Sequence, residues 1–262
     1  MLSRLFRRWS RPDKVPVGYF LHLPKCAGTA VIAGFTQRAN RPWVIVSDSP
    51  GSKRQANQAL QTKLNHSPGG GGQVGLVMGH DVNLAMPRLP ELEMRTAFWF
   101  TFLRHPVERY VSHFRYLNQC RQNPAHPLHA FAEQSLTMEG RVLNLEQYVE
   151  ARQMPNLMAQ YLGSAADPNL NSKRWTHYGN ELFQLAQSAL DQMDYVGFQE
   201  SLAEDIDKLS RKLQISATVV RTNVTKGTTG TLSTALIRRI EQLNDLDLEL
   251  YSLAKSRLVA HT

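Results

Sequence analysis

The first part of the chain alternates short apolar runs with longer polar or mixed segments. Apolar runs of about four to eight residues are typical of strands that are buried on both faces of a sheet. Such runs cover residues 17–23, 43–46, 74–78 and 96–103, and a short one follows at 195–198. Strands that alternate with helical segments predict a parallel sheet with helices on both faces.

Apolar residues in the second half of the chain recur with the period of a helix. Leu202, Ile206, Leu209 and Leu213 are spaced so that they share one face of an amphipathic helix. The other expected helices are residues 28–40, 53–64, 107–118, 145–152, 155–162, 181–192 and one or two helices within 232–258. A last short strand is expected at 218–221. The predicted fold class is α/β, with a P-loop-like central parallel sheet flanked by helices and a helical C-terminal half.

A chain of 262 residues suits one large domain or two small ones. Residues 1–16 are basic and contain two prolines, which predicts a loose N-terminal arm. The glycine-rich segment 66–72 predicts a flexible loop, and no other stretch resembles a domain linker. We therefore expect the arm to be followed by a single domain over residues 17–262.

The formal net charge of +8 predicts an anionic partner, such as a phosphorylated cofactor, a polyanion or a membrane surface. The basic arm is either a peripheral contact to such a surface or a solvated tail. The sequence contains no apolar run of 18 residues and no signal-peptide core, so we expect a cytoplasmic protein that does not span a membrane. The two cysteines, Cys26 and Cys120, make no disulfide framework, and no Cys/His spacing predicts a metal site.

A candidate phosphate-binding loop follows the first expected strand. Pro24 ends the apolar run, Lys25, Gly28 and Thr29 follow, and a helix is expected to begin there. Backbone N–H groups at a helix start can bind an anion together with a nearby ammonium group. The loop differs from a Walker A sequence, because its lysine precedes the glycine and Gly-x-x-x-x-Gly-Lys-Ser/Thr is absent. Cys26 in this loop is interpreted as a small residue in a tight turn.

Two more candidate residues follow strands that we expect in the same sheet. His80 comes after the third expected strand and Arg104 after the fourth. Ligands of parallel sheets bind beyond the carboxyl ends of the strands. The sequence therefore predicts a shared active site that includes Lys25, His80 and Arg104.

These segments resemble the sulfotransferases that use 3′-phosphoadenosine-5′-phosphosulfate. The segment Leu23-Pro-Lys-Cys-Ala-Gly-Thr29 resembles their 5′-phosphosulfate loop, above all that of the heparan sulfate 2-O and 6-O type carbohydrate sulfotransferases. The segment Phe102-Leu-Arg-His-Pro-Val-Glu-Arg-Tyr-Val-Ser112 is similar to their 3′-phosphate motif, and His80 matches the position of their catalytic base. Weaker similarities occur in the family's order at residues 156–162, 195–202, 223–230 and 246–251.

The chain departs from the family pattern at two places. Cys26 and Ala27 stand where the family has Thr-Gly, so one hydroxyl group and one permissive glycine are lost. His105 stands where the family usually has aspartate. Neither change removes a group to which the resemblance assigns chemistry.

The resemblance implies sulfuryl transfer from 3′-phosphoadenosine-5′-phosphosulfate to an acceptor hydroxyl, expected to belong to a glycan, which leaves adenosine 3′,5′-bisphosphate. Lys25 would donate to the bridging oxygen and His80 would act as general base, with no metal required. The residues implied to bind the donor are Lys25, Cys26, Ala27, Gly28, Thr29, Ala30, Arg104, Ser112, Lys226 and Gly227.

Several residues carry a second interpretation. His80 could be a hydrogen-bonded structural histidine, and Lys226-Gly227 could form a plain turn. Arg109 is as compatible with a salt bridge or surface position as with a cofactor contact. His22 is interpreted as a packed or supporting residue.

Two other functions stay open at this point. A P-loop nucleotide phosphotransferase is disfavoured by the missing Walker motifs. A non-catalytic polyanion or nucleic-acid binder fits the charge, yet no nucleic-acid-binding motif occurs, so no nucleic-acid partner is expected. Residues 121–180 are expected to select the acceptor, and they match nothing specific.

Overall fold

A computed structural model describes residues 15–45, 62, 74–84, 96–151, 154–167, 179–219 and 232–259. The predictions for most of the basic arm, for the helix at 53–64 apart from Thr62, for the loop at 66–72 and for Lys226-Gly227 lie outside these residues. The chain divides into two compact units. The sheet unit contains Met1–Leu103 and Gln160–Val224, and the helical unit contains Arg104–Ala159 and Thr225–Thr262.

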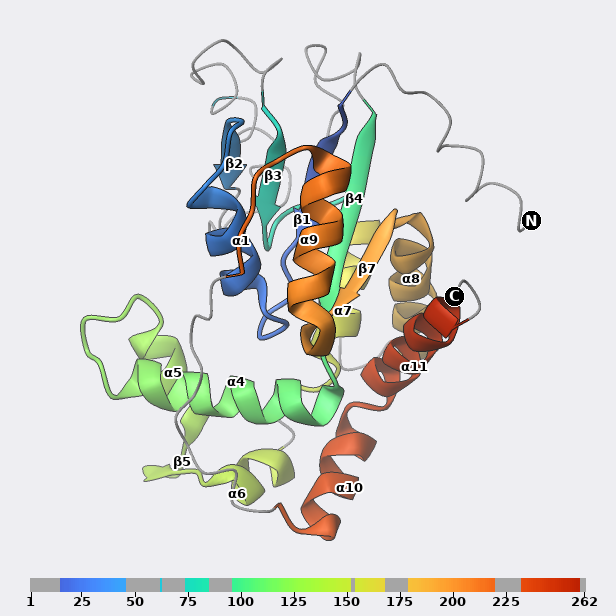
Figure 1. Cartoon of the computed structure of the whole chain (residues 1–262). Helices are drawn as coiled ribbons and strands as arrows, with labels where there is room; N and C mark the ends of the chain where they lie inside the picture. Colours follow the sequence, from blue (N-terminus) through green and yellow to red (C-terminus); the bar gives the residue numbers. More distant parts are fainter. Residues whose placement is uncertain are drawn as a thin grey trace. The chain divides into compact units, whose positions relative to one another are not determined.

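Five parallel strands of the described residues form the sheet, in the order β2-β3-β1-β4-β7 (Figure 1). Their bounds are β1 Val17–Leu21, β2 Trp43–Ile45, β3 Leu76–Gly79, β4 Ala97–Leu103 and β7 Tyr195–Phe198. β1 pairs with β3 on one side and with β4 on the other. The predicted central parallel sheet is confirmed.

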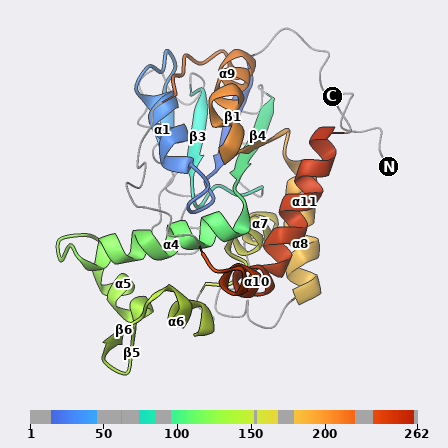
Figure 2. The ribbon, with the colours of Figure 1, turned by 60° about the horizontal axis from the view of Figure 1, so that its bottom comes forward.

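Helices cover both faces of this sheet (Figures 1 and 2). α1 (Gly28–Thr36) and α9 (Leu202–Leu213) lie on one face. α8 (Gly179–Gln192) and the later part of α7 (Leu157–Ala166) lie on the other. A short 3₁₀ turn, Gln199–Ser201, joins β7 to α9.

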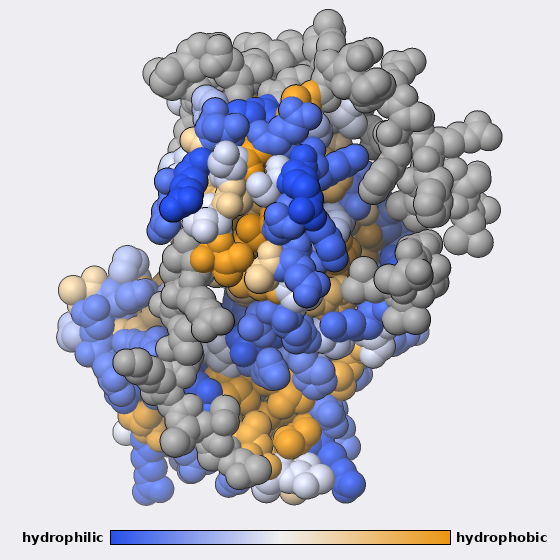
Figure 3. Space-filling view, in the orientation of Figure 1, coloured by the Kyte–Doolittle hydropathy of each residue, from blue (hydrophilic) through white to orange (hydrophobic). Residues whose placement is uncertain are grey.

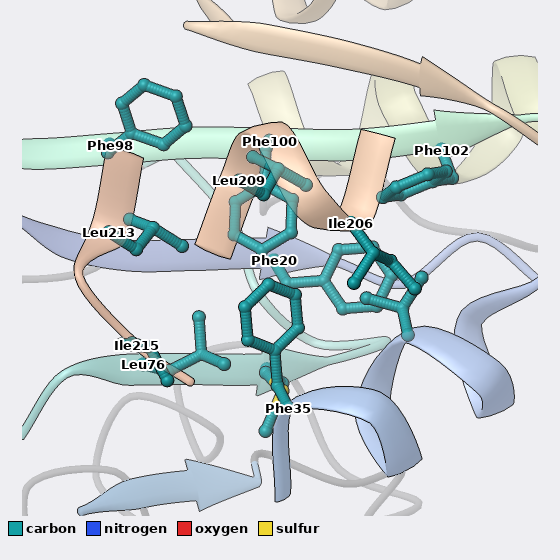
Figure 4. Packing of buried hydrophobic residues seen from close by; sticks show 12 residues of the cluster. Phe20, Phe35, Leu76, Phe98, Phe100, Phe102, Ile206, Leu209, Leu213 and Ile215 are labelled. Carbon is teal, nitrogen blue, oxygen red and sulfur yellow. The ribbon is translucent and has the colours of Figure 1, made fainter. Parts of the chain in front are cut away.

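The core between the sheet and α1 and α9 is built from alternate strand residues (Figure 4). Phe20 of β1 stacks on Phe100 of β4 with ring centroids 5.1 Å apart. α9 contributes the predicted apolar face, since Ile206, Leu209 and Leu213 are buried. Each such side chain stabilises the fold by roughly 1.5–3 kcal/mol through burial. The outward side of α9 is hydrophilic (Figure 3).

The strand expected at 218–221 is not present at its described residues. Thr218 and Val219 have no strand structure, and residues 220 and 221 lie outside the described part. The backbone N–H of Thr218 donates instead to the carbonyl of Gly34 in α1, at 3.1 Å. Gly34 permits this approach, because a Cβ atom there would lie 2.5 Å from the Thr218 carbonyl oxygen. The prediction of a strand was therefore wrong for these two residues.

The helical unit is built around α4 (Pro106–Arg121), which contacts α5, α6, α10 and α11 (Figure 2). The bounds of these elements are α5 His129–Leu136, α6 Leu145–Glu150, α10 Thr234–Leu243 and α11 Asp245–Val259, with an antiparallel hairpin of β5 Thr137–Met138 and β6 Arg141–Val142. The apolar side of α4 is buried against α5, α6 and α10. The predicted helix pair within 232–258 is confirmed as two helices that meet at Asn244.

A buried polar network joins α4 to α11 within the helical unit. The guanidinium of Arg109 lies 3.7 Å from the carboxylate of Asp247, and both side chains are fully buried. Arg109 also donates to the side-chain oxygen of Asn244 at 3.0 Å. The carboxylate of Asp247 accepts the backbone N–H groups of Met158 and Ala159 at 3.2 and 2.8 Å. Removing one partner would leave the other charge buried and unpaired, so this network holds α4 and α11 together.

No helix within the described ranges is both long and apolar enough to cross a membrane.

A second polar cluster fixes β7 against α9 in the sheet unit. The buried carboxylate of Asp205 accepts the Tyr195 hydroxyl at 2.7 Å, the Ser201 hydroxyl at 2.8 Å and the Phe198 backbone N–H at 2.9 Å. Burial, followed by the hydrogen bond to Asp205, raises the pKa of Tyr195 well above its ordinary value. The phenol therefore stays protonated and remains a donor to this carboxylate.

Replacing Asp205 by alanine should lower the free energy of unfolding by about 2–4 kcal/mol, because buried donors lose their acceptor. Asp207 on the same helix is the matched control, since its ion pair with Arg211 is exposed. Asp207→Ala should cost about 0.5 kcal/mol or less. Denaturant unfolding of both variants measures the difference. Equal losses would contradict a structural role of the Asp205 cluster.

Candidate functional site

The loop between β1 and α1 has an unusual backbone. Lys25 and Ala27 both have φ of 66°, in the left-handed region. Cys26 lies between them and is buried, with its thiol 3.7 Å from the carbonyl oxygen of Pro24. Its burial agrees with the interpretation of Cys26 as a turn residue. The two left-handed residues turn the chain sharply between the end of β1 and the start of α1.

The start of α1 offers backbone donors to a ligand. Among the described residues, no acceptor faces the N–H groups of Ala27, Gly28 and Thr29. The N–H groups of Ala30 and Val31 donate to the carbonyl of Ala27 at 2.9 and 3.1 Å, so they serve the turn itself. The first turn contains no acidic side chain. Unpaired amides and the positive end of the helix dipole make this helix start attractive to an anion.

His22 lies against this helix start from the end of β1. A Cβ atom on Gly28 would overlap the His22 ring at Cδ2 and Nε2. Gly28 is therefore required for close contact between ring and helix, in addition to any part in ligand binding. The His22 ring also stacks on the His80 ring, with centroids 3.9 Å apart and planes inclined by 20°.

His80 directly follows β3, the neighbour of β1, as the sequence predicts. Its Nδ1 lies 2.6 Å from the backbone carbonyl oxygen of His22. A carbonyl oxygen only accepts, so Nδ1 carries the hydrogen and Nε2 holds the lone pair when the ring is neutral. The rings of His80 and Tyr161 meet in a T-shaped arrangement, with centroids 5.6 Å apart. This geometry suits a general base and is equally that of a well-held structural histidine.

His22 is held in its neutral form. Part of the residue remains exposed, yet its ring is packed among other groups, and this desolvation lowers its pKa well below the ordinary value. The positive charges of His80 and Lys25 lower the pKa further. Of the two predicted catalytic residues of the sheet unit, His80 is in direct contact with His22, through both the ring and the backbone carbonyl.

Arg104 and Ser112 belong to the helical unit. The Nε of Arg104 donates to the carboxylate of Glu108 at 3.3 Å, one turn along the chain, and this pair is partly exposed. Ser112 is half-buried on α4. His105 faces Tyr251 edge-on, with ring centroids 5.5 Å apart. His105 therefore packs against α11 within the helical unit.

The two interpretations of Arg109 can now be separated. Its side chain is fully buried and paired with Asp247 and Asn244, so it takes the salt-bridging role. Lys226 and Gly227 lie outside the described residues.

Two residues near His80 were not assigned to the site from the sequence. His22 was interpreted as packed or supporting, and its place between Gly28 and His80 agrees with that. Tyr161 lies in the segment 156–162, whose weak similarity to the family gave this residue no role of its own. Its signal was weak: one aromatic residue in a helical segment, whose distance from His80 along the chain hides their contact.

The backbone of Ala27 generates a stability prediction. A left-handed φ destabilises a residue with a Cβ atom by roughly 1–2 kcal/mol, and glycine relieves this strain. Glycine also raises the conformational entropy of the unfolded state, which offsets part of the gain in stability. Ala27→Gly should therefore stabilise the protein by about 0.5–1 kcal/mol. Ala30→Gly, three residues on and inside α1, should destabilise it by about 1 kcal/mol. Thermal or denaturant unfolding compares them, and destabilisation by both would refute the left-handed conformation of Ala27.

The chain resembles the crystal structure of a sulfotransferase from Alicyclobacillus acidocaldarius at 13% identity, covering 92% of this chain and 96% of that one, with a TM-score of 0.45. A likeness of that size carries no argument by itself. No curated protein matches the sequence at a significant level.

A family match gives the stronger result. Residues 19–254 match the model of the sulfotransferase family, and this range includes the loop after β1, His80, Arg104 and Ser112. Because the match covers far more than half of the sequence, the chain belongs to the sulfotransferase family.

Proposed function

We propose that this protein transfers a sulfuryl group from 3′-phosphoadenosine-5′-phosphosulfate to the hydroxyl of an acceptor, a glycan. One observation carries the proposal: the His22 ring lies between Gly28, at the start of α1, and the His80 ring, while Nδ1 of His80 lies 2.6 Å from the His22 carbonyl oxygen. Membership of the sulfotransferase family gives this arrangement its reaction class. The donor and the class of acceptor rest on the sequence motifs.

The loop after β1 would hold the sulfated end of the donor. The N–H groups of Ala27, Gly28 and Thr29 would donate to the 5′-phosphate, with the exposed Thr29 side chain as a further donor. Cys26 and Ala30 would contribute through the shape of the turn, because the Ala30 amide already donates to Ala27.

Lys25 would assist departure of the nucleotide. When the acceptor oxygen bonds to sulfur, the bond from sulfur to the bridging oxygen breaks, and negative charge develops on that oxygen. The Lys25 ammonium stabilises this charge most strongly in the transition state, which is what accelerates the reaction. Lysine and helix start supply the positive field that metal ions supply in many phosphoryl transfers.

His80 would take the proton from the acceptor. The hydrogen on Nδ1 is held by the His22 carbonyl, so Nε2 is the nitrogen that accepts. The electron pair of the acceptor O–H bond remains on oxygen, which forms the bond to sulfur. The products are the sulfate ester, adenosine 3′,5′-bisphosphate and the protonated histidine.

The remaining donor contacts rest on the 3′-phosphate motif. Arg104 would bind the 3′-phosphate with its guanidinium, whose Nε is held by Glu108. Ser112 would add a hydroxyl. Lys226-Gly227, outside the described residues, are either a further contact to the nucleotide or a plain turn.

The acceptor is best identified by a screen. Purified protein is incubated with donor labelled with radioactive sulfur and a panel of glycans, lipids and phenols. Transfer to a glycan supports the proposal, whereas transfer only to a phenol or lipid would revise the acceptor class. Magnesium-dependent ATP turnover without sulfuryl transfer would favour a phosphotransferase. Salt-sensitive oligonucleotide binding without donor affinity would favour a polyanion binder.

Replacing either catalytic side chain should abolish transfer while leaving the fold intact. Lys25→Ala removes the charge at the leaving oxygen, and His80→Ala removes the base, each at a cost of about 100-fold or more in kcat. Lys208→Ala, on an exposed part of α9, is the matched lysine control and should keep full activity. Initial rates of label transfer measure all three. Full activity of Lys25→Ala and His80→Ala would contradict the catalytic roles proposed for these two residues.

Arg104 should contribute to the affinity for a nucleotide only when that nucleotide carries a 3′-phosphate. Arg104→Ala should weaken binding of adenosine 3′,5′-bisphosphate by about 10- to 100-fold, the effect of losing charge-assisted hydrogen bonds. Its affinity for adenosine 5′-monophosphate, which lacks the 3′-phosphate, should stay unchanged. Calorimetry with both ligands and both proteins completes the comparison. An equal loss for the two nucleotides would point to a structural role of Arg104.

A further inference from the structure

His22 takes part in more contacts around the candidate site than any role given to it so far explains. Its ring stacks on His80, lies 5.7 Å from the ring of Phe20 and rests on Gly28. Its backbone carbonyl bonds to Nδ1 of His80. Backbone and side chain of one residue therefore both hold the predicted base.

The carbonyl determines which nitrogen of His80 accepts a proton. In a free neutral imidazole, the hydrogen can reside on either nitrogen. The 2.6 Å contact to the His22 carbonyl selects the form with hydrogen on Nδ1. This selection lasts only while the His80 ring stays within reach of that carbonyl.

The rings determine whether His80 stays there. The stack on His22, with centroids at 3.9 Å and planes inclined by 20°, restricts tilting of the His80 ring. The edge contact with Tyr161, at 62°, restrains it from a second element, α7. His22 in turn cannot move toward α1, because Gly28 already touches its ring.

The charge state of His22 fits this role. A protonated His22 would repel both Lys25 and a protonated His80, and burial disfavours its charged form. The neutral ring can therefore remain stacked while His80 gains and loses a proton.

We propose that His22 is a positioning residue: it holds His80 in the Nδ1–H tautomer and fixes the plane of its ring against the donor loop. The part of this inference that concerns turnover rests on the proposed function, since it takes His80 as the base. The part that concerns tautomer and orientation does not.

The tautomer is tested by NMR of protein labelled with ¹⁵N-histidine, at a pH where His80 is neutral. His80→Gln identifies the His80 signals by their loss. In the unsubstituted protein, Nδ1 of His80 should show the shift of a protonated nitrogen and Nε2 that of an unprotonated one. The opposite pattern, or an average of the two forms, would overturn the proposal without any substitution of His22.

The role of the His22 ring in holding His80 is tested by two substitutions with large apolar side chains. His22→Phe keeps a flat ring that can stack, and His22→Leu fills the space without one. His22→Leu should shift the His80 signals toward a mixture of tautomers, and His22→Phe should restore most of the original pattern. Thr101→Val is the structural control, because it removes a buried hydrogen bond to the carbonyl of Leu21, the neighbour of His22. It should leave the His80 pattern unchanged. An unchanged pattern in His22→Leu would overturn the proposal.

Transfer rates complete the test. His22→Leu should lower kcat by about 10- to 100-fold, as expected for a misplaced base, with little change in KM for the donor. His22→Phe should recover most of this loss. A rise in KM for the donor with unchanged kcat would assign His22 to donor binding and overturn the positioning role. If the NMR results hold while even the unsubstituted protein transfers no sulfuryl group, the proposed function fails and the positioning role stands.

Discussion

The backbone pairing of β1 on both sides is the constraint on which the candidate site depends. β1 is hydrogen-bonded to β3 and β4, and all of its residues are buried. A strand in this position has no freedom to shift, since a slip of one residue would break its register with both neighbours and exchange the side chains that pack on each face. The carbonyl of His22 and the turn that carries Lys25 follow this strand directly. The positions of the His22 carbonyl and of Lys25 are therefore determined first by the pairing of the sheet, and only then by the loop.

Much of this arrangement was predictable from the sequence, because the informative signals are local. Apolar runs identified the strands, and the spacing of Ile206, Leu209 and Leu213 identified the buried face of α9. The position of Lys25 and His80 after neighbouring strands followed from the rule for parallel sheets. A short motif that begins and ends at residues such as proline and glycine can be recognised without any knowledge of distant contacts.

The features that escaped prediction depend on partners far away in the sequence. Thr218 lacks strand structure because its backbone N–H donates a hydrogen bond to the carbonyl of Gly34 in α1, and no residue near Thr218 in the sequence indicates this bond. Arg109 belongs to the structural network because Asp247, far along the chain, is buried beside it. The contact of Tyr161 with His80 likewise joins two segments that share no pattern. Long-range polar and ring contacts leave little trace in the periodicity of the sequence, so such roles become visible only in the folded structure.

The contact of the His22 ring with Gly28 also bears on how this site can change in evolution. Both residues lie in one short peptide, 22–30, together with the lysine and the helix start. Any side chain at position 28 would need the space that the ring occupies, so these two positions cannot vary independently. A smaller residue at position 22 would have to be acquired first or together with a larger one at 28. The peptide is therefore expected to be inherited as a block, while segments that touch neither residue are free to diverge around it.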